Sequence, residues 1–236
     1  MPTALGVVAS HRSGILFVPP TTGLRAWFDA ATDASFQYRT GDQIMSWENK
    51  TGLTSPLNDY YGPGPHRSGM QNDYRTVVFN GESLASNEWM PNTDNLTMVV
   101  AFKHTGAGSG SVEIFRLGAY WGYSVMARSD NQNLGTLCSN SAWVHTATPG
   151  VLGAPTVLVS QRTAGTWTMH RDGVSLPITD GATATPGAPG NNESWLSPSP
   201  NLFIGEIYEL LIYAQALSNA ERQQVETYLK IKWATT

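Results

Sequence analysis

From residue 24 the pattern of apolar and polar residues becomes strand-like, as at 166–171, where Trp167 and Met169 alternate with Thr168 and His170. The segment 96–103 is apolar at nearly every position, so we expect a strand that is covered on both faces. Further strands are expected at residues 112–117, 122–127, 156–161, 166–171 and 203–213. Asp172 and Gly173 tolerate the positive φ angles of a tight hairpin turn, so Val174 should begin the return strand.

Two later segments depart from the strand pattern. Residues 177–200 are rich in Gly, Pro, Ala, Ser and Asn, which predicts a long surface loop or several turns. Residues 218–233 follow helical spacing, and Ser218 with Glu221 three positions later forms a capping box that predicts where this helix begins. We expect one amphipathic helix packed on the sheets, with apolar residues in the seam at Leu217, Val225 and Leu229.

The first 22 residues show neither the period of a strand nor that of a helix. We therefore expect two parts, an extended N-terminal arm over residues 1–22 and one domain over residues 23–236. The arm contains a short apolar run that is too small to form its own core. Left in water, this run would expose a patch that proteins normally cover, so it is the expected assembly contact. It consists of Ile15, Leu16, Phe17 and Val18.

Composition supports an all-β domain and excludes some functions. Among 236 residues there are 23 glycines and 14 prolines, and only 14% are charged, which fits many short strands joined by turns. The net charge is −4 and no basic stripe is present. A nucleic-acid partner is therefore not expected, since nucleic-acid binding needs clustered positive charge.

The cysteine content and the lengths of the hydrophobic runs indicate whether the chain forms disulfides, is exported or spans a membrane. Cys138 is the only cysteine, so no intrachain disulfide can form. The apolar run at residues 15–18 is too short for the core of a secretion signal, and no run approaches a membrane span. We expect a soluble protein, made without a classical export signal and with no membrane partner.

Three segments in order resemble the concanavalin A-like lectin/glucanase superfamily, in its laminin-G-like bacterial and phage branch. They are residues 23–30 (GLRAWFDA) with 44–52 (IMSWENKTG), residues 77–84 (VVFNGESL), and residues 204–218 (IGEIYELLIYAQALS). The resemblance covers residues 23–233 and implies an all-β, concanavalin A-like jelly-roll β-sandwich with one C-terminal α-helix. It also implies that Asp29 is a turn residue or a cap and that Glu209 holds a loop by hydrogen bonds. It is less specific for function, because one fold hosts many functions.

Catalytic and metal chemistry find little support in the sequence. Glycoside hydrolysis normally needs two carboxylates that flank one bond. The alternating Glu-x-Asp-x-Glu strand of the related glucanases does not occur, and Glu113 stands alone. Glu206 and Glu209 are three residues apart on one expected strand, which predicts that they point to opposite faces. We expect no enzyme activity and no cofactor, and we assign no metal ligands.

Sugar binding remains open because exposed aromatic rings can cover the apolar faces of sugars while Asn and Asp bind their hydroxyls. Aromatic rings are also common in β-sandwich cores, so the same residues could serve the core or an interface. The candidate carbohydrate-binding residues are Trp89, Tyr120, Trp121, Tyr123 and Trp143.

These observations favour a non-catalytic binding protein and leave two interpretations. The favoured one is a structural protein of a tailed-phage virion, made in the host cytoplasm. It would decorate the capsid or associate with the tail, and would dock on other virion proteins through its arm. The alternative is a lectin-like module that binds host or surface glycans. Self-association into a homo-oligomer is left open.

Overall fold

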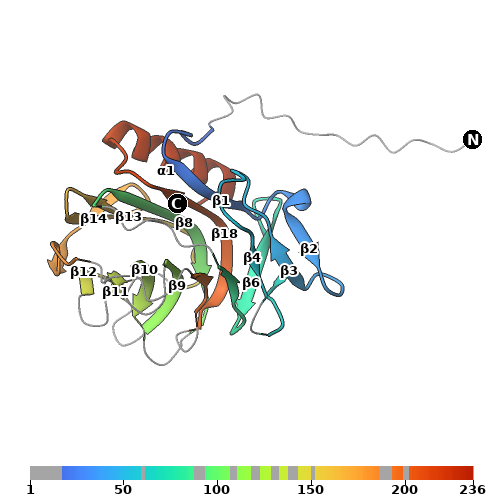
Figure 1. Ribbon diagram of the computed structural model, residues 1–236. Helices are drawn as coiled ribbons and strands as arrows, with labels where there is room; N and C mark the ends of the chain where they lie inside the picture. The colour runs from blue at the N-terminus through green and yellow to red at the C-terminus, as the bar shows by residue number, and fades with distance from the viewer. Residues whose placement is uncertain are drawn as a thin grey trace, which may run out of the picture.

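Two antiparallel β-sheets packed face to face form the domain, and one helix lies on the outside (Figure 1). The computed structural model describes residues 18–59, 62–87, 94–106, 111–117, 123–128, 133–137, 143–149, 152–185, 193–198 and 202–235.

The first sheet, called sheet A, has eight strands. Their order is β15 (Val174–Leu176), β14 (Thr166–Arg171), β13 (Thr156–Thr163), β8 (Leu96–His104), β18 (Ile204–Tyr213), β6 (Tyr74–Asn80) and β5 (His66–Gln71), and β1 (Leu24–Asp29) also pairs with β18. The middle strand β8 is buried at every position except one half-buried residue. This confirms the prediction that both of its faces are covered.

The second sheet, called sheet B, has ten strands. Their order is β16 (Ile178–Asp180), β12 (Trp143–Pro149), β11 (Asn133–Leu137), β10 (Tyr123–Arg128), β9 (Ser111–Leu117), β17 (Ser194–Leu196), β7 (Leu84–Ser86), β4 (Leu57–Asn58), β3 (Ile44–Trp47) and β2 (Phe36–Tyr38). A short 3-10 helix at Asp33–Ser35 precedes β2. The strands β16 and β17 correct the expectation that residues 177–200 form only loop. Pairing with β12, β7 and β9 supplies the backbone hydrogen bonds that their composition did not predict.

The core lies between the two sheets and is almost entirely apolar. Inward-facing side chains such as Val100, Phe102, Leu158 and Phe115 are at most 3% exposed. A polar contact lies within this layer, where the hydroxyls of Thr136 on β11 and Ser160 on β13 are 2.6 Å apart. Each hydroxyl therefore has a partner in a region where an unpaired polar group would be costly.

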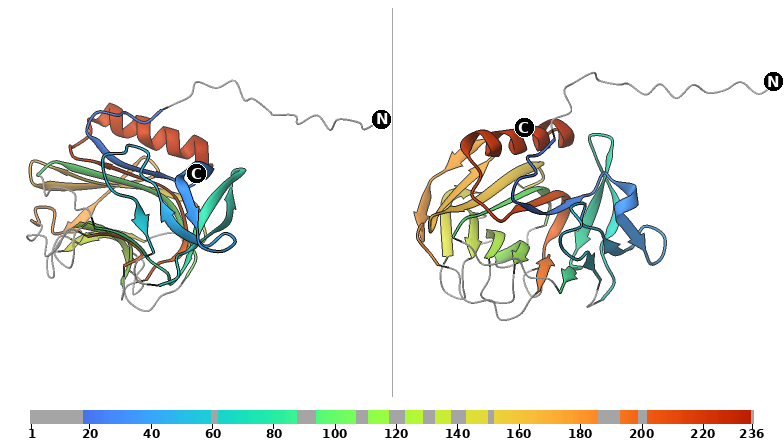
Figure 2. Two further views of the ribbon diagram at one scale, coloured as in Figure 1. Left: turned by 45° about the vertical axis from the view of Figure 1, so that its right-hand side comes forward. Right: turned by 45° about the horizontal axis from the view of Figure 1, so that its top comes forward.

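A second buried layer separates sheet A from helix α1 (Asn219–Trp233), which lies on the side of sheet A away from sheet B (Figure 2). The capping box is present as predicted. The Ser218 hydroxyl accepts a hydrogen bond from the Glu221 amide, and the Glu221 carboxylate accepts one from the Ser218 amide. Leu217, Val225 and Leu229 are 3%, 0% and 0% exposed, which confirms that the helix is docked through them.

The turn between β5 and β6 caps the other end of this helix. The side-chain amide of Gln71 donates a hydrogen bond to the Trp233 carbonyl at 2.8 Å, and that of Asn72 donates one to the Lys232 carbonyl at 2.7 Å. These carbonyls have no partner within the helix, so the turn satisfies them. Asp172 and Gly173 both have positive φ, at 52° and 88°, and confirm the predicted hairpin turn between β14 and β15.

A β-bulge in β18 corrects the prediction for its two glutamates. Opposite β8, Glu206 pairs with Lys103 and Glu209 pairs with Ala101, so Tyr208 is the extra residue between them. Lys103 and Ala101 are two apart on β8 and share a face, and therefore Glu206 and Glu209 also share a face. This face is the outer one, which the helix partly covers.

Candidate functional site

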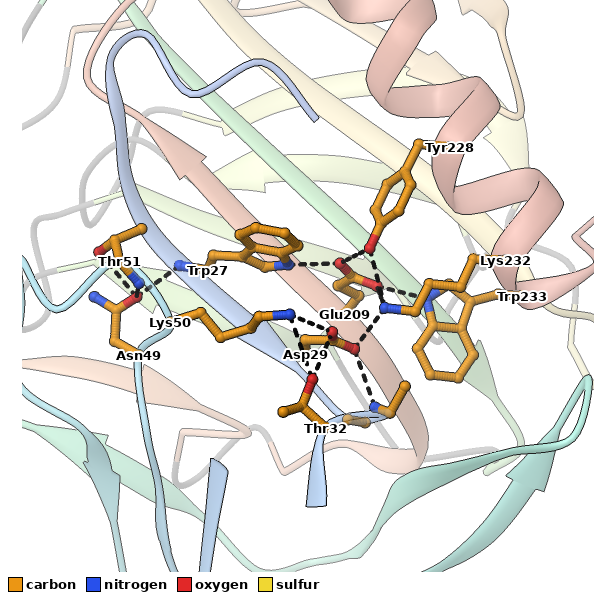
Figure 3. A network of polar contacts seen from close by, with 12 residues as sticks. Trp27, Asp29, Thr32, Asn49, Lys50, Thr51, Glu209, Tyr228, Lys232 and Trp233 are labelled. Atoms are coloured by element: carbon orange, nitrogen blue, oxygen red, sulfur yellow. Dashed lines mark hydrogen bonds and ion pairs between the residues drawn. The ribbon is translucent and has the colours of Figure 1, made fainter. Parts of the chain in front are cut away.

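A buried polar network joins β1, β18 and α1, with the carboxylate of Glu209 at its centre (Figure 3). Glu209 is 0% exposed. Its Oε1 accepts hydrogen bonds from Trp27 Nε1 at 2.6 Å and from the Tyr228 hydroxyl at 2.8 Å. Its Oε2 accepts from Lys232 Nζ at 2.7 Å and from Trp233 Nε1 at 2.8 Å. The carboxylate therefore accepts four hydrogen bonds, two at each oxygen, and three of the donors belong to the helix.

Asp29 at the end of β1 extends the network. Its Oδ1 accepts from Lys232 Nζ at 2.6 Å and from the Ala31 amide at 3.0 Å. Its Oδ2 accepts from Lys50 Nζ at 2.8 Å and from the Thr32 hydroxyl at 2.9 Å. The bonds to residues 31 and 32 confirm that Asp29 is a turn residue, as the resemblance implied.

The electrostatics of the network match a structural role. Two carboxylates, Asp29 and Glu209, face two ammonium groups, Lys50 and Lys232, so the charges balance. Burial raises the pKa of the Glu209 carboxyl, against the opposing effect of Lys232. Burial also acts to raise the pKa of Asp29, but Lys232 and Lys50 together bring it below its usual value of 3.8. Glu209 thus fastens the helix to the sheet, and does not hold a loop as the resemblance implied.

The side chain of Asn49 belongs to the same region and is fully engaged. Its Oδ1 accepts from the Trp27 and Thr51 amides at 2.8 and 3.1 Å, and its amide nitrogen donates to the Arg25 carbonyl at 3.2 Å. Asn49 is 8% exposed. Residues 49–51 match the Asn-x-Ser/Thr pattern of N-glycosylation sites, but here the asparagine side chain is taken up by contacts with β1.

A different arrangement lies on the outer face of sheet B, at its β12–β16 edge. The rings of Trp143 and His145 on β12 are stacked, with 5.6 Å between the ring centroids and 13° between the ring planes. Both residues are half-buried. Asp180 on β16 pairs with His145 and is exposed. Directly paired residues share a face of a sheet, so the carboxylate lies on the same face as the two rings. We call these three residues the aromatic platform.

Tight packing behind the platform fixes its position. The turn after β16 approaches the backbone of β12 so closely that a Cβ on Gly181 would lie 1.8 Å from the Trp143 carbonyl oxygen. Gly181 also has φ of +72°, where glycine is favoured. The buried Trp167 holds the same turn by donating hydrogen bonds to the Ala182 and Ala184 carbonyls at 2.7 and 3.0 Å.

The outer face of sheet B also contains a buried ion pair on β9. Arg116 donates to both oxygens of Glu113 at 2.6 and 2.7 Å. The two residues are 8% and 1% exposed. A bidentate pair of this kind is the strong form of the interaction, and each partner neutralises the other. Glu113, which stands alone in the sequence, is therefore engaged with a cation in the fold.

The sequence-predicted site residues fall unevenly on the structure. Trp143 is a member of the aromatic platform, and Tyr123 is the first residue of β10. Trp89, Tyr120 and Trp121 lie outside the described residues, as do Ile15, Leu16 and Phe17 of the assembly contact.

The fourth residue of the assembly contact, Val18, is described. Its side chain is 52% exposed, and its carbonyl accepts a hydrogen bond from Gln224 of α1 at 2.8 Å. The chain at this point therefore runs beside its own helix before entering β1.

Sequence reasoning missed His145 and Asp180. A histidine and an aspartate 35 positions apart carry no spacing signal, because only the pairing of β12 with β16 brings them together. Among the described residues, no group of three or more His, Cys, Asp or Glu side chains is arranged to hold a metal ion. Within the same residues, no helix has the length and apolar character needed to span a membrane.

Comparison with known proteins identifies the fold. No protein-family model matches the chain, and no curated protein matches it in sequence. Among solved structures, the sialidase of Trypanosoma rangeli matches with a TM-score of 0.61 and 13% identity over 92% of this chain. This chain spans only 34% of the length of that sialidase.

Domain 4 of AbnA, a GH43 extracellular arabinanase from Geobacillus stearothermophilus, was solved in complex with arabinotriose. It matches with a TM-score of 0.63 and 18% identity, over 87% of this chain and 98% of that domain. Both likenesses are of fold alone. Together with the sheets and helix described above, they show that this chain has the expected fold, a jelly-roll β-sandwich with one C-terminal helix.

Proposed function

We propose that this protein is a carbohydrate-binding module that holds glycans on the outer face of sheet B without cleaving them. The observation that carries the proposal is the aromatic platform, where the stacked rings of Trp143 and His145 lie beside the exposed carboxylate of Asp180. A half-exposed ring offers an apolar surface to the C–H face of a sugar, and a carboxylate accepts hydrogen bonds from hydroxyls.

The fold likeness supports the same function. The arabinanase domain that shares this fold along almost its full length was solved with a bound oligosaccharide. Carbohydrate binding is therefore compatible with a sandwich of this size and shape, although the residues that perform it here must be this chain's own.

Binding without cleavage is supported by the state of the carboxylates. Glu209, Asp29 and Glu113 are buried and engaged by cationic side chains. Glu206 accepts hydrogen bonds from Thr76 at 2.6 Å and from Lys103 at 3.3 Å. Most glycosidases need two accessible carboxylates on either side of one bond. The described residues present no such pair around the platform.

The virion interpretation stays a prediction. It depends on the arm, of which only residues 18–22 are described, and neither the described contacts nor the comparisons point to a capsid or tail partner.

The test is a glycan array followed by calorimetry on the platform variants. Trp143→Ala should weaken binding by about tenfold or more, because one stacking face is lost. Tyr38→Ala is the matched control, since Tyr38 is a 36% exposed ring on β2, at the far end of the same sheet. Asp180→Asn should weaken binding less and change the preference among sugars. Absence of binding across a broad panel, or binding that Trp143→Ala leaves intact, would refute the proposal.

A further inference from the structure

A second tryptophan lies in the same row of sheet B as Trp143. On β17, Trp195 pairs with Arg116 of β9, which pairs with Ser124 of β10. Ser124 pairs with Leu137 of β11, which pairs with Trp143 of β12. The register of four consecutive strand pairs thus places the two tryptophans in one row of paired residues. They bound a five-residue stretch of this row, which continues past Trp195 to Ala85 on β7.

Both tryptophans are on the outer face. The neighbours of Trp195 on its strand, Ser194 and Leu196, are buried, and Ser194 lines a small cavity between the sheets. Val144, next to Trp143, is 0% exposed in the core. Because side chains alternate along a strand, Trp195 and Trp143 point away from that core. Both are half-buried, so part of each side chain is accessible.

Each tryptophan has a carboxylate beside it. Trp195 Nε1 donates a hydrogen bond to Glu193 Oε2 at 3.2 Å, and Asp180 stands beside the Trp143–His145 stack. Between them, the charge of Arg116 is neutralised by its bidentate bond to Glu113. A row that has a carboxylate at each end and a neutralised cation between them disfavours an acidic ligand.

The distance between the two ends indicates what could occupy both. Four inter-strand steps of about 4.8 Å separate β17 from β12, which gives a span of about 19 Å, the length of about four sugar rings in an extended chain. One monosaccharide cannot reach both rings. Since Arg116 and Glu113 are covered, the contacts of such a chain would concentrate at its two ends.

Building on the proposed function, we propose that sheet B binds a neutral, linear oligosaccharide that runs across the strands, with one sugar on Trp143 and another on Trp195. The ring and carboxylate at each end form a subsite for hydroxyl-rich, uncharged sugars. Neither subsite alone defines the ligand, because its length is set by the spacing of the strands. Trp195 is therefore a specificity-determining residue for chain length.

The experiment is calorimetry with two series of neutral linear oligosaccharides, arabino- and gluco-, from the disaccharide to the hexasaccharide. The full chain should bind more tightly with each added ring up to about four or five rings, with little gain beyond that, because both subsites are then filled. Trp195→Ala should abolish this gain, so that a long ligand loses about tenfold in affinity while the disaccharide loses little. Tyr38→Ala should leave the length dependence unchanged.

A second variant, Glu193→Gln, distinguishes loss of a subsite from loss of stability. If Trp195→Ala lowers the melting temperature, Glu193→Gln keeps the ring and its packing while removing the carboxylate, and it should still weaken long ligands selectively. Affinity that depends on Trp143 but not on chain length would overturn the two-subsite proposal and leave the proposed function standing. Uronic and sulfated oligosaccharides of the same lengths are titrated in parallel, and tighter binding of these acidic chains would also overturn it. Failure of every glycan to bind would remove both proposals.

Discussion

The outer faces of both sheets carry tryptophans near a carboxylate, but the carboxylate is buried on sheet A and exposed on sheet B. On sheet A, Trp27 and Trp233 surround the carboxylate of Glu209 beneath the helix, and every oxygen of that carboxylate is bonded within the chain. On sheet B, Trp143 lies half-buried beside the exposed carboxylate of Asp180. The two regions thus differ in exposure: the carboxylate under the helix is buried with its bonds made inside the chain, whereas the carboxylate of Asp180 is exposed.

The comparison predicts that changes in the seam under α1 alter stability, while changes on the platform alter binding. The free energy of unfolding and the affinity for glycans should therefore respond to separate sets of substitutions. A variant that changed both by a large amount would show that the two regions are coupled.

The largest effect is expected from Val225→Asp. Val225 is 0% exposed in the seam between α1 and sheet A. An aspartate there would place a charged carboxylate in an apolar seam. The substitution should therefore lower the free energy of unfolding by about 4 to 5 kcal/mol. Val174→Asp is the control, because Val174 is 66% exposed and the same change should cost at most about 0.5 kcal/mol. Urea denaturation of both variants measures the difference, and equal midpoints would show that the helix is not docked.

A slightly smaller effect is expected from Glu209→Ala. Removing this carboxylate leaves the indole N–H groups of Trp27 and Trp233 and the Tyr228 hydroxyl without their acceptor. Lys232 keeps Asp29 as a partner, so the loss should be about 3 kcal/mol. Glu206→Ala is the matched control on the same strand and face. Its carboxylate has two donors and a 15% exposed side chain, so its loss should cost about 1 kcal/mol.

The binding measurement sharpens this prediction. Glu209→Ala that remains folded at low temperature should bind glycans as the unchanged protein does. Loss of binding in the folded variant would show that the network under the helix supports the platform, contrary to the separation of the two faces.

The sequence predicted the elements that depend on local pattern. The capping box at Ser218 and Glu221, the docked residues of the helix, the doubly buried β8 and the turn at Asp172 and Gly173 are all as expected. Each follows from neighbours within a few positions, where periodicity and turn chemistry act directly.

What the sequence did not predict depends on pairing between distant segments. The bulge at Tyr208 leaves no mark in composition, yet it moves Glu206 to the face of Glu209. Strands β16 and β17 lie in a segment of loop-like composition and form because a partner strand is available. For the candidate site, composition singled out Trp143, but the register that brings in Asp180 and Trp195 was needed to define a surface.

The smallest expected effect concerns a histidine in the seam. His170 on β14 faces α1, and burial together with the positive charge of Arg222 lowers its pKa below the usual 6.5. Its Nδ1 has no hydrogen-bond partner among the described residues. Arg222 itself is paired with Glu226 at 2.6 Å, and the backbone carbonyl of Asp172 accepts from Lys230 at 3.2 Å in the same seam. A proton on His170 would therefore add a charge next to a cation whose partner is already engaged.

The sign of the pH dependence follows from this lowered pKa. Because the unfolded chain binds a proton on His170 more readily than the folded protein, stability is unaffected well above pH 6.5 and falls as the pH drops below it. The loss should be at most about 1 kcal/mol, because solvent screens the interaction of this half-buried ring with Arg222. His104, whose pKa is also lowered by burial, contributes in the same direction.

His170→Asn should reduce the slope of unfolding free energy against pH without removing it, as measured by urea titrations between about pH 8 and pH 5. The difference between the two proteins at about pH 8, where both histidines are neutral, isolates the packing cost of the substitution. An unchanged slope in the variant would show that His170 does not titrate against the helix, and that the polar seam tolerates charge more readily than its burial implies.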